Sequence, residues 1–256
     1  RLFLRHSFQS VTSKGFERFC LYLPTGQPTC TGDKKSWCVI TVMHRLIAPN
    51  KDESALLPQF LELPEQAIHI PQTEAEFEAA FRAINAEPVL GFDTESKPLF
   101  NVGQHDSGPH LVQLATTQQA WLLQLHLPKA LELSRKVLFA EHICKVGFGL
   151  DNDKHTLPRR LGAPLVNIQD LDSRFKQLGY GASVGVRAAA ALVLKQSFRK
   201  SKRTTTSNWA AIDLTPAQRR YAANDAHAPA VIYAHMLAWE STVPVQPQRR
   251  RHNPQA

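Results

Sequence analysis

Long apolar runs are missing from this sequence of 256 residues. The longest such stretch, 186–194, is interrupted by Arg187 and is largely alanine, whereas a membrane-spanning helix needs roughly 18 apolar residues. The four cysteines form no Cys-x-x-Cys pair and have no companion histidine cluster, which argues against a zinc site. With 43% hydrophobic and 20% charged residues, the composition excludes collagen, a disulfide-stapled miniprotein and wholesale disorder. We therefore expect a soluble protein with one sizeable core.

Residues 1–42 are expected to lie outside the folded domain. The sequence begins with arginine and its first methionine is Met43, so we interpret these residues as a poorly ordered over-extended gene start or fragment boundary. The apolar run 19–23 is too short for the core of a signal peptide, and no small-residue cleavage site follows it, which predicts a cytoplasmic location. We expect the domain to span 43–240, and residues 241–256, with three consecutive arginines, to form a basic disordered tail.

Charge is unevenly distributed along the chain, whose formal net charge is +8. Residues 43–95 hold three basic and ten acidic residues, a net charge of −7, whereas residues 96–240 have a net charge of +8. An acidic region beside a basic surface is typical of a metal-dependent enzyme that acts on a polyanion, although many other proteins share this feature.

Capping signals and periodicity predict where the chain forms helices and strands. Thr73 and Glu76 form a capping box, which predicts a helix of about four turns that Pro88 ends. An apolar run then meets the carboxylates of Asp93 and Glu95, which is typical of a buried strand with acidic residues at its end. Antiparallel strands followed by alternating strands and helices indicate a mixed sheet covered on both faces. The further strands are expected at 111–115, 120–125, 145–150 and 165–168, and the further helices at 127–142, 153–161, 183–195 and from Thr215 to about residue 239.

Four carboxylates are notable because of their places on these elements. Asp93 and Glu95 are two residues apart, so they point to the same face of a strand, where they repel each other and favour a hard divalent cation. This pair alone would also suit a solvated strand end. Asp153 lies where a helix begins, and Asp151 and Asn152 compete with it for the role of helix cap. Asp225 lies in the middle of an alanine-rich helix, so its burial requires a partner.

Three segments share the order and spacing of one nuclease family. Residues 92–95 are similar to its first motif, residues 146–153 to its second, in a register that selects Asp153, and residues 221–226 to its third. Over about 68–240, the chain resembles the ribonuclease D-like and Werner-type 3′-5′ exonuclease domains of the DEDD superfamily. The third motif has a tyrosine four residues before its aspartate, which is typical of the tyrosine subclass. The histidine subclass needs a histidine five residues before that aspartate, where this sequence has arginine.

The resemblance implies an RNase H-like (DnaQ-like exonuclease) α/β fold, with a mixed five-stranded sheet and helices on both faces. It implies two Mg²⁺ or Mn²⁺ ions roughly 3.5–4 Å apart, which hydrolyse a phosphodiester by in-line displacement. Asp93 is then expected to bridge both ions, Glu95 and Asp225 to bind the first, and Asp153 to act on the second through water. Tyr221 is expected to orient the attacking water, because its unperturbed pKa of about 10 makes it a poor base.

A basic segment precedes the third motif. The expected substrate is the 3′ end of single-stranded DNA or RNA, held through its backbone by this segment. On its own, the segment would equally suit a solvated flexible loop. Trp209 is expected either to pack structurally or to stack on a base. The candidate substrate-binding residues are Arg199, Lys200, Lys202, Arg203 and Trp209.

Two other functions remain open at this level. The first is a non-catalytic module that uses an exonuclease fold to hold nucleic acid or a protein partner. The second is a ribonuclease H-type endonuclease, which shares carboxylate and metal chemistry but lacks the spacing of Tyr221 and Asp225. Full-length ribonuclease D carries helical nucleic-acid-binding domains after its nuclease domain. Compared with that arrangement, a free-standing exonuclease domain, or one that takes its specificity from a protein partner, fits this sequence better. The pattern does not choose between DNA and RNA.

Overall fold

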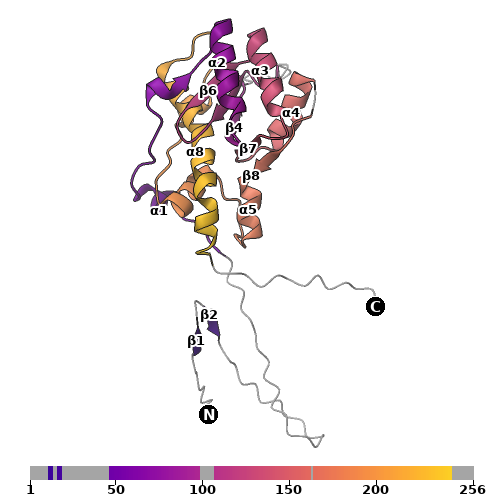
Figure 1. Cartoon of the computed structure of the whole chain (residues 1–256). Helices are drawn as coiled ribbons and strands as arrows, with labels where there is room; N and C mark the ends of the chain where they lie inside the picture. The colour runs from indigo at the N-terminus through magenta and orange to yellow at the C-terminus, as the bar shows by residue number, and fades with distance from the viewer. Residues whose placement is uncertain (1–10, 14–15, 19–45, 99–106, 163, 244–256) are drawn as a thin grey trace, which may run out of the picture. The chain divides into compact units, whose positions relative to one another are not determined.

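A computed structural model of the chain describes residues 11–13, 16–18, 46–98, 107–162 and 164–243 (Figure 1). The stretch Leu46–Val243 forms one compact unit, to which every residue of the candidate site belongs. Outside it, the short strands β1 (Val11–Ser13) and β2 (Phe16–Arg18) pair in antiparallel fashion. The predictions of a poorly ordered extension over 1–42 and a disordered tail over 241–256 lie almost wholly outside the described residues.

The compact unit is built on a mixed sheet with the strand order β3-β6-β5-β4-β7-β8. The strands β4, β5 and β6 form an antiparallel meander, whereas β7 is parallel to β4, β8 to β7 and β3 to β6. The predicted mixed sheet is confirmed, but it has six strands rather than five, because a two-residue edge strand such as β3 is too short to show a periodic pattern. The strands are β3 (Ile68–His69), β4 (Val89–Glu95), β5 (Leu111–Ala115), β6 (Ala120–Gln124), β7 (Cys144–Gly147) and β8 (Ile168–Asp170).

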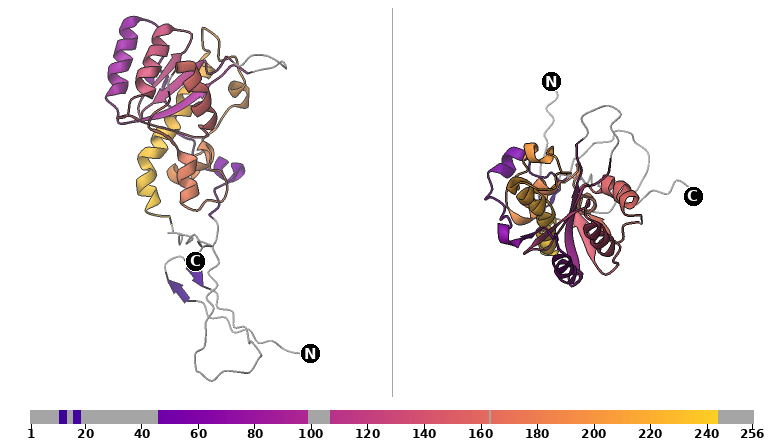
Figure 2. Two further views of the ribbon diagram at one scale, coloured as in Figure 1. Left: turned by 90° about the vertical axis from the view of Figure 1, so that its right-hand side faces the viewer. Right: turned by 90° about the horizontal axis from the view of Figure 1, so that it is seen from above.

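Helices cover both faces of this sheet (Figure 2). On one face, Val112 and Leu114 of β5 pack against α2 (Glu74–Asn85), α3 (Pro128–Leu138) and α4 (Asp151–Leu161). On the other face, Leu111 and Ala115 pack against the long helix α8 (Pro216–Glu240). Because side chains alternate along a strand and both faces are covered, every residue of β5 is buried. Within the described ranges, no helix combines the length and apolar character needed to cross a membrane.

Several elements differ from the predictions for local reasons. The helix α3 ends at Leu138 rather than near 142, because the buried Lys145 donates from Nζ to the carbonyls of Ala140 and Ile143, at 2.9 and 2.8 Å, and holds that segment outside the helix. The helix predicted over 183–195 begins at Val186 as α6 (Val186–Ala189) and continues as a π-helix (Ala190–Leu194). The sequence patterns do not predict α1 (Lys51–Ala55), the 3₁₀ turn η1 (Glu65–Ala67), α5 (Leu171–Gln177) and α7 (Lys202–Thr205).

Gly91 lets α8 lie directly against β4. A Cβ atom at Gly91 would lie 1.8 Å from the carbonyl oxygen of Ala226 and 3.0 Å from the amide nitrogen of Ala230, which leaves no room for a side chain. Asp93 follows Gly91 on the same face of β4, and Asp225 directly precedes Ala226 on α8. The close approach of helix and strand therefore brings these two aspartates together.

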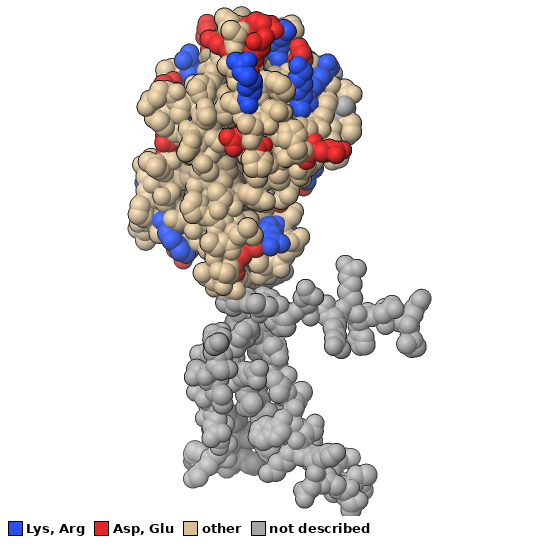
Figure 3. Space-filling model, in the orientation of Figure 1, with Lys and Arg blue, Asp and Glu red and all other residues tan. Residues whose placement is uncertain are grey.

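One exposed ion pair joins α2 and α3 at one end of the unit, and another lies within α3. Lys129 Nζ lies 2.7 Å from Glu74 Oε1, and Lys136 Nζ lies 2.9 Å from Glu132 Oε1. Figure 3 shows side chains of both charges at the top of the view, where these helices lie. Such exposed pairs typically contribute about 0–1 kcal/mol each, so this charged surface needs no functional explanation.

Candidate active site

The edge of the site is formed by Asp93 and Glu95 at the end of β4. Both side chains are partly exposed and lie on the face of the sheet that α8 covers. Asp93 accepts a hydrogen bond of 2.8 Å from the backbone N–H of Thr94. Across the sheet, Asp93 is paired in register with Gln113 of β5. The predicted placement of two carboxylates on one strand face is therefore present.

Asp225 reaches this edge from α8. Its side chain is buried, with 3% exposed, and Lys200 Nζ lies 2.9 Å from its Oδ2 atom. Lys200 therefore supplies the partner that burial of this carboxylate requires. In the described part of the chain, Oδ2 accepts no hydrogen bond of good geometry, so the ammonium balances its charge without saturating it.

Asp153 approaches from the side of the sheet that α4 covers. It is the third residue of α4, is 8% exposed, and accepts a hydrogen bond through Oδ1 from the hydroxyl of Thr94. The turn before α4 is held by Asp170, whose Oδ2 accepts from the N–H of Leu150 at 3.0 Å. Thr94 therefore joins Asp153 to the strand that carries the first two carboxylates.

The charges of these residues act on one another. Burial raises the pKa of Asp93 to about 8, and the charge of Asp225 adds to this effect. Burial, followed by the charge of Asp93, raises the pKa of Glu95 to about 9, and burial also raises the pKa of Asp153 and Asp225. Burial alone would lower the pKa of Lys200, but Asp225 and Asp93 outweigh it and raise that pKa. Because Asp153 also raises the pKa of Asp93 and Glu95, the four carboxylates and one ammonium form a single electrostatic cluster.

The cluster suits a hard divalent cation in donor type and charge. It offers carboxylate oxygens, which Mg²⁺ and Mn²⁺ prefer, and among them the buried Oδ2 of Asp225, which lies 2.9 Å from Lys200 Nζ but accepts no hydrogen bond of good geometry from any described residue. The described residues hold no group of three acidic, histidine or cysteine side chains already arranged around one point. A divalent ion at Asp225 would therefore have to displace Lys200 Nζ, which lies 2.9 Å from Oδ2.

Tyr221 lies one helical turn before Asp225, as predicted. Its hydroxyl lies 2.8 Å from Oγ1 of Thr205, and Lys200 Nζ lies 5.9 Å from the centre of its ring. Burial raises the pKa of Tyr221. The phenol is therefore neutral at physiological pH and is suited to orient a group by hydrogen bonding, not to remove a proton from it.

The basic segment is not the flexible loop that its sequence alone would suit. It contains the helix α7, which Ser201 caps, and Lys202 and Arg203 lie exposed on this helix. The alternative that Trp209 stacks on a base is wrong for this structure. Trp209 is only 1% exposed and packs against the ring of Tyr221. Its Nε1 donates to the carbonyl of Thr205 at 3.2 Å, so the ring is held inside the protein.

The structure adds three polar residues that the sequence motifs do not single out. Thr94 and Thr205 bond to Asp153 and Tyr221, respectively. Gln113 is fully buried opposite Asp93, and neither atom of its amide group has a hydrogen-bond partner among the described residues. A single polar residue inside the apolar strand 111–115 is the signal that could have identified Gln113.

Comparisons with known proteins identify the family of this chain. A family model described as 3′-5′ exonuclease matches residues 68–238. The bifunctional 3′-5′ exonuclease/ATP-dependent helicase WRN of Mus musculus is 28% identical over 148 residues, which are 57% of this chain and 10% of that protein. The chain thus spans about a tenth of the length of this relative.

Solved structures show the same fold. The EXO domain of Aedes aegypti Nibbler matches with a TM-score of 0.61 and 22% identity, over 73% of this chain and 94% of that chain. Escherichia coli RNase D, an exoribonuclease involved in structured RNA processing, matches with a TM-score of 0.57 and 19% identity, over 68% of this chain and 45% of that chain. The predicted RNase H-like fold of the DEDD exonucleases is confirmed. Since the family model spans more than half of the sequence and includes all three acidic segments, the chain belongs to the 3′-5′ exonuclease domain family.

Proposed function

We propose that this chain is a metal-dependent 3′-5′ exonuclease that removes nucleotides from the 3′ end of single-stranded DNA or RNA. The observation that carries this proposal is the meeting of Asp225 with Asp93 and Glu95 at one edge of the sheet. Tyr221 lies one turn before Asp225 on α8, with the spacing of the third family motif. A non-catalytic binding module would not need four neighbouring carboxylates whose negative charges repel one another.

Asp93, Glu95 and Asp225 would hold the divalent ions, with Asp153 acting through water. When bound, Mg²⁺ or Mn²⁺ supplies a Lewis acid and lowers the pKa of the attacking water. Asp93 and Glu95 have raised pKa values, so they must lose their protons before they can act as ligands. Tyr221 orients the water from its position beside Asp225.

The nucleic-acid strand would be held by exposed cations. Arg199, Lys202 and Arg203 are exposed and follow the segment that carries α6. Backbone contacts of this kind read no sequence and weaken with salt. Of the matched proteins, RNase D is an exoribonuclease, whereas the mouse relative combines its exonuclease with a helicase. Both DNA and RNA therefore belong in the test.

The experiment follows single-stranded DNA and RNA oligonucleotides labelled at the 5′ end, with Mn²⁺ or Mg²⁺ added. We expect a ladder of products that shorten by single nucleotides. Asp93→Asn and Asp225→Asn should each lower the rate at least about a hundredfold, because a lost charged ligand removes several kcal/mol of transition-state stabilisation. The matched control is Asp151→Asn, an exposed aspartate on α4 that should leave the rate unchanged.

Other outcomes identify the alternatives. Release of internal fragments would favour an endonuclease. Binding without any shortening, in every metal tested, would favour a non-catalytic binding module. Full activity of Asp93→Asn or Asp225→Asn would contradict the assignment of these residues.

A further inference from the structure

A basic pocket lies beside the carboxylate cluster. It has a volume of about 410 Å³ and is lined by residues of α1, the turn after β7, α5 and α6. Its charged side chains are Lys51, Arg187, Lys200 and Asp172. We propose that this pocket binds one nucleotide of a nucleic-acid strand, with the phosphate held by the three cations. This inference rests on the proposed function and extends it by naming residues outside the family motifs.

The charge of the pocket favours an anion. Asp172 is already satisfied, because its Oδ2 lies 2.6 Å from Lys176 Nζ and its Oδ1 accepts from the N–H of Val184 at 2.6 Å. In contrast, neither Lys51 nor Arg187 has an ion pair or a side-chain hydrogen bond to any described residue. Because Lys200 is already paired with Asp225, the unbalanced positive charge of the pocket comes from Lys51 and Arg187.

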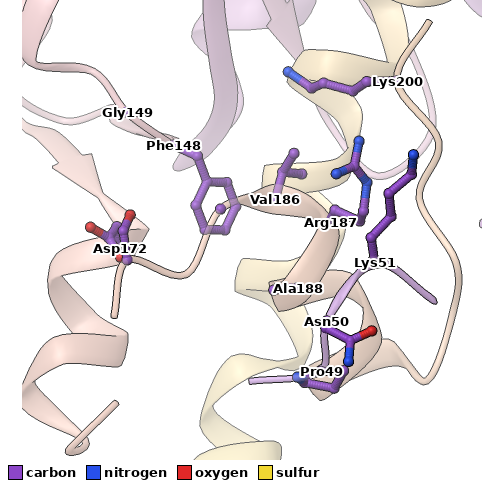
Figure 4. A pocket seen from close by; sticks show the side chains of 12 residues that line it. Pro49, Asn50, Lys51, Phe148, Gly149, Asp172, Val186, Arg187, Ala188 and Lys200 are labelled. Carbon is purple, nitrogen blue, oxygen red and sulfur yellow. The ribbon is translucent and has the colours of Figure 1, made fainter. Parts of the chain in front are cut away.

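The side chains are arranged so that a phosphate and a base would find different surfaces. Figure 4 shows Lys51, Arg187 and Lys200 on one side of the view and Asp172 on the opposite side, with the ring of Phe148 between them. Phe148 is partly exposed and stacks on Phe175, with ring centres 6.5 Å apart, so its position is supported. Aromatic faces of this kind stack on bases without sequence preference.

Lys200 links the pocket to the candidate active site. The same side chain lines the pocket and lies 2.9 Å from Asp225. A strand whose scissile phosphate lies at the carboxylates can therefore extend a neighbouring nucleotide into the pocket. Arg187 and Lys51 come from α6 and α1, which lie outside the three acidic segments, so the motifs of the family do not reveal them.

The test measures binding without hydrolysis. The whole chain, kept in EDTA, is titrated against a 5′-fluorescent single-stranded oligonucleotide at several salt concentrations, and the anisotropy gives Kd. Each phosphate contact contributes about 0.7 to the slope of log Kd against log salt for a single strand, so Arg187→Met and Lys51→Met should each reduce the slope by about that amount. Arg187→Lys keeps the charge and should keep the slope.

Matched controls carry the same changes away from the pocket. Arg82→Met on α2 and Lys136→Met on α3 remove exposed cations on the other face of the sheet and should leave the slope unchanged. Phe148→Leu should weaken binding about fivefold or more at every salt concentration, because it removes base stacking but no charge. Thermal unfolding of each variant separates lost binding from lost folding, and Lys51→Met, at an exposed position, remains informative if Arg187→Met does not fold.

The nucleotide in the pocket is either the terminal nucleotide that hydrolysis releases or an inner nucleotide of the strand, and competition by a nucleoside 5′-monophosphate distinguishes the two. If the monophosphate competes with the oligonucleotide, and Arg187→Met abolishes this competition, the pocket binds the released terminal nucleotide. If the monophosphate does not compete, the pocket binds an inner nucleotide of the strand. Unchanged slopes in both Arg187→Met and Lys51→Met would overturn the inference, even if the wild type hydrolyses its substrate. Conversely, slopes that fall in a protein without any turnover would leave the pocket assigned and refute the proposed hydrolysis.

Discussion

Lys200 and Asp225 form the closest pair of opposite charges in the candidate site, with 2.9 Å between Nζ and Oδ2. The ammonium stabilises a carboxylate that is almost fully buried, and it does so where a divalent cation would bind. In the proposed mechanism, a metal ion would therefore compete with Lys200 for Asp225, and its affinity would depend on how readily Lys200 leaves. If the positive pocket binds a nucleotide as proposed, its phosphate would give the displaced ammonium a new partner.

Lys200→Met should tighten binding of Mn²⁺ in the absence of substrate, by about tenfold, which corresponds to about 1.4 kcal/mol. The reason is that methionine keeps the apolar part of the side chain but removes the competing charge. Calorimetric titration of the protein with Mn²⁺ measures this effect. Lys154→Met, which removes an exposed lysine 3.4 Å from Asp151, is the control, and unchanged or weaker binding in Lys200→Met would contradict the competition.

The raised pKa values of Asp93 and Glu95 predict how stability depends on pH when no metal is present. A carboxyl whose pKa is higher in the folded state binds more protons when folded, so the free energy of unfolding should fall as the pH rises from about 5 through 9. Thermal unfolding in EDTA across this range tests the sign. Asp93→Asn should raise Tm by about 2–4 °C at pH 8, equivalent to about 1 kcal/mol, and should flatten the profile. Stability that rises with pH over this range would show that these carboxyls are not destabilised by burial.

The sequence predicts the site residues that lie close together in the chain. Strand alternation predicts that Asp93 and Glu95 share one face of β4, and helical spacing predicts that Tyr221 and Asp225 lie one turn apart. Both arrangements are present. Contacts between distant segments leave no such pattern. For that reason the pairing of Lys200 with Asp225 could not be predicted.

At the scale of elements, helices and strands with strong local sequence signals were predicted correctly, whereas very short elements were missed. The capping boxes at Thr73 and Thr215 are both formed, and α2 and α8 begin directly after them. The strand predicted over 111–115 matches β5 in full. In contrast, β3 has two residues and α1 five, so both depend on tertiary contacts rather than on periodicity.

The crossing of α8 over β4 depends on Gly91. Gly91→Ala should lower the free energy of unfolding by about 3 kcal/mol or more, because the new methyl group would lie 1.8 Å from a backbone oxygen that cannot move without shifting α8. Chemical denaturation measures this loss, and Mn²⁺ binding should weaken in the same variant, since Asp225 moves with the helix. Gly185→Ala is the matched control, because a Cβ there meets no atom within 4 Å. Equal stabilities of the two variants would show that α8 does not depend on this contact.

At the scale of the whole molecule, most of the net positive charge lies in residues outside the compact folded unit. The compact unit begins at Leu46, whose N–H donates to the carbonyl of Gly179 at 3.3 Å. Residues 1–42 hold six basic and two acidic residues, and residues 244–256 hold three arginines, so most of the net charge of +8 lies outside the unit. The two parts should therefore contribute to different properties, the unit to stability and to the proposed hydrolysis, and the flanking residues to long-range attraction of a polyanion.

A fragment of residues 43–243, which starts at Met43, tests this separation. Its Tm should lie within about 2 °C of that of the whole chain, because it keeps the six-stranded sheet and every helix that packs on it. Its rate on a saturating oligonucleotide should also be unchanged. Its affinity for single-stranded nucleic acid at low salt should be lower than that of the whole chain, and the difference should shrink as salt is added, because the removed residues act through screened charge. A fragment that unfolds would show that the flanking residues belong to the fold, and an affinity difference that persists at high salt would show that they contact the substrate specifically.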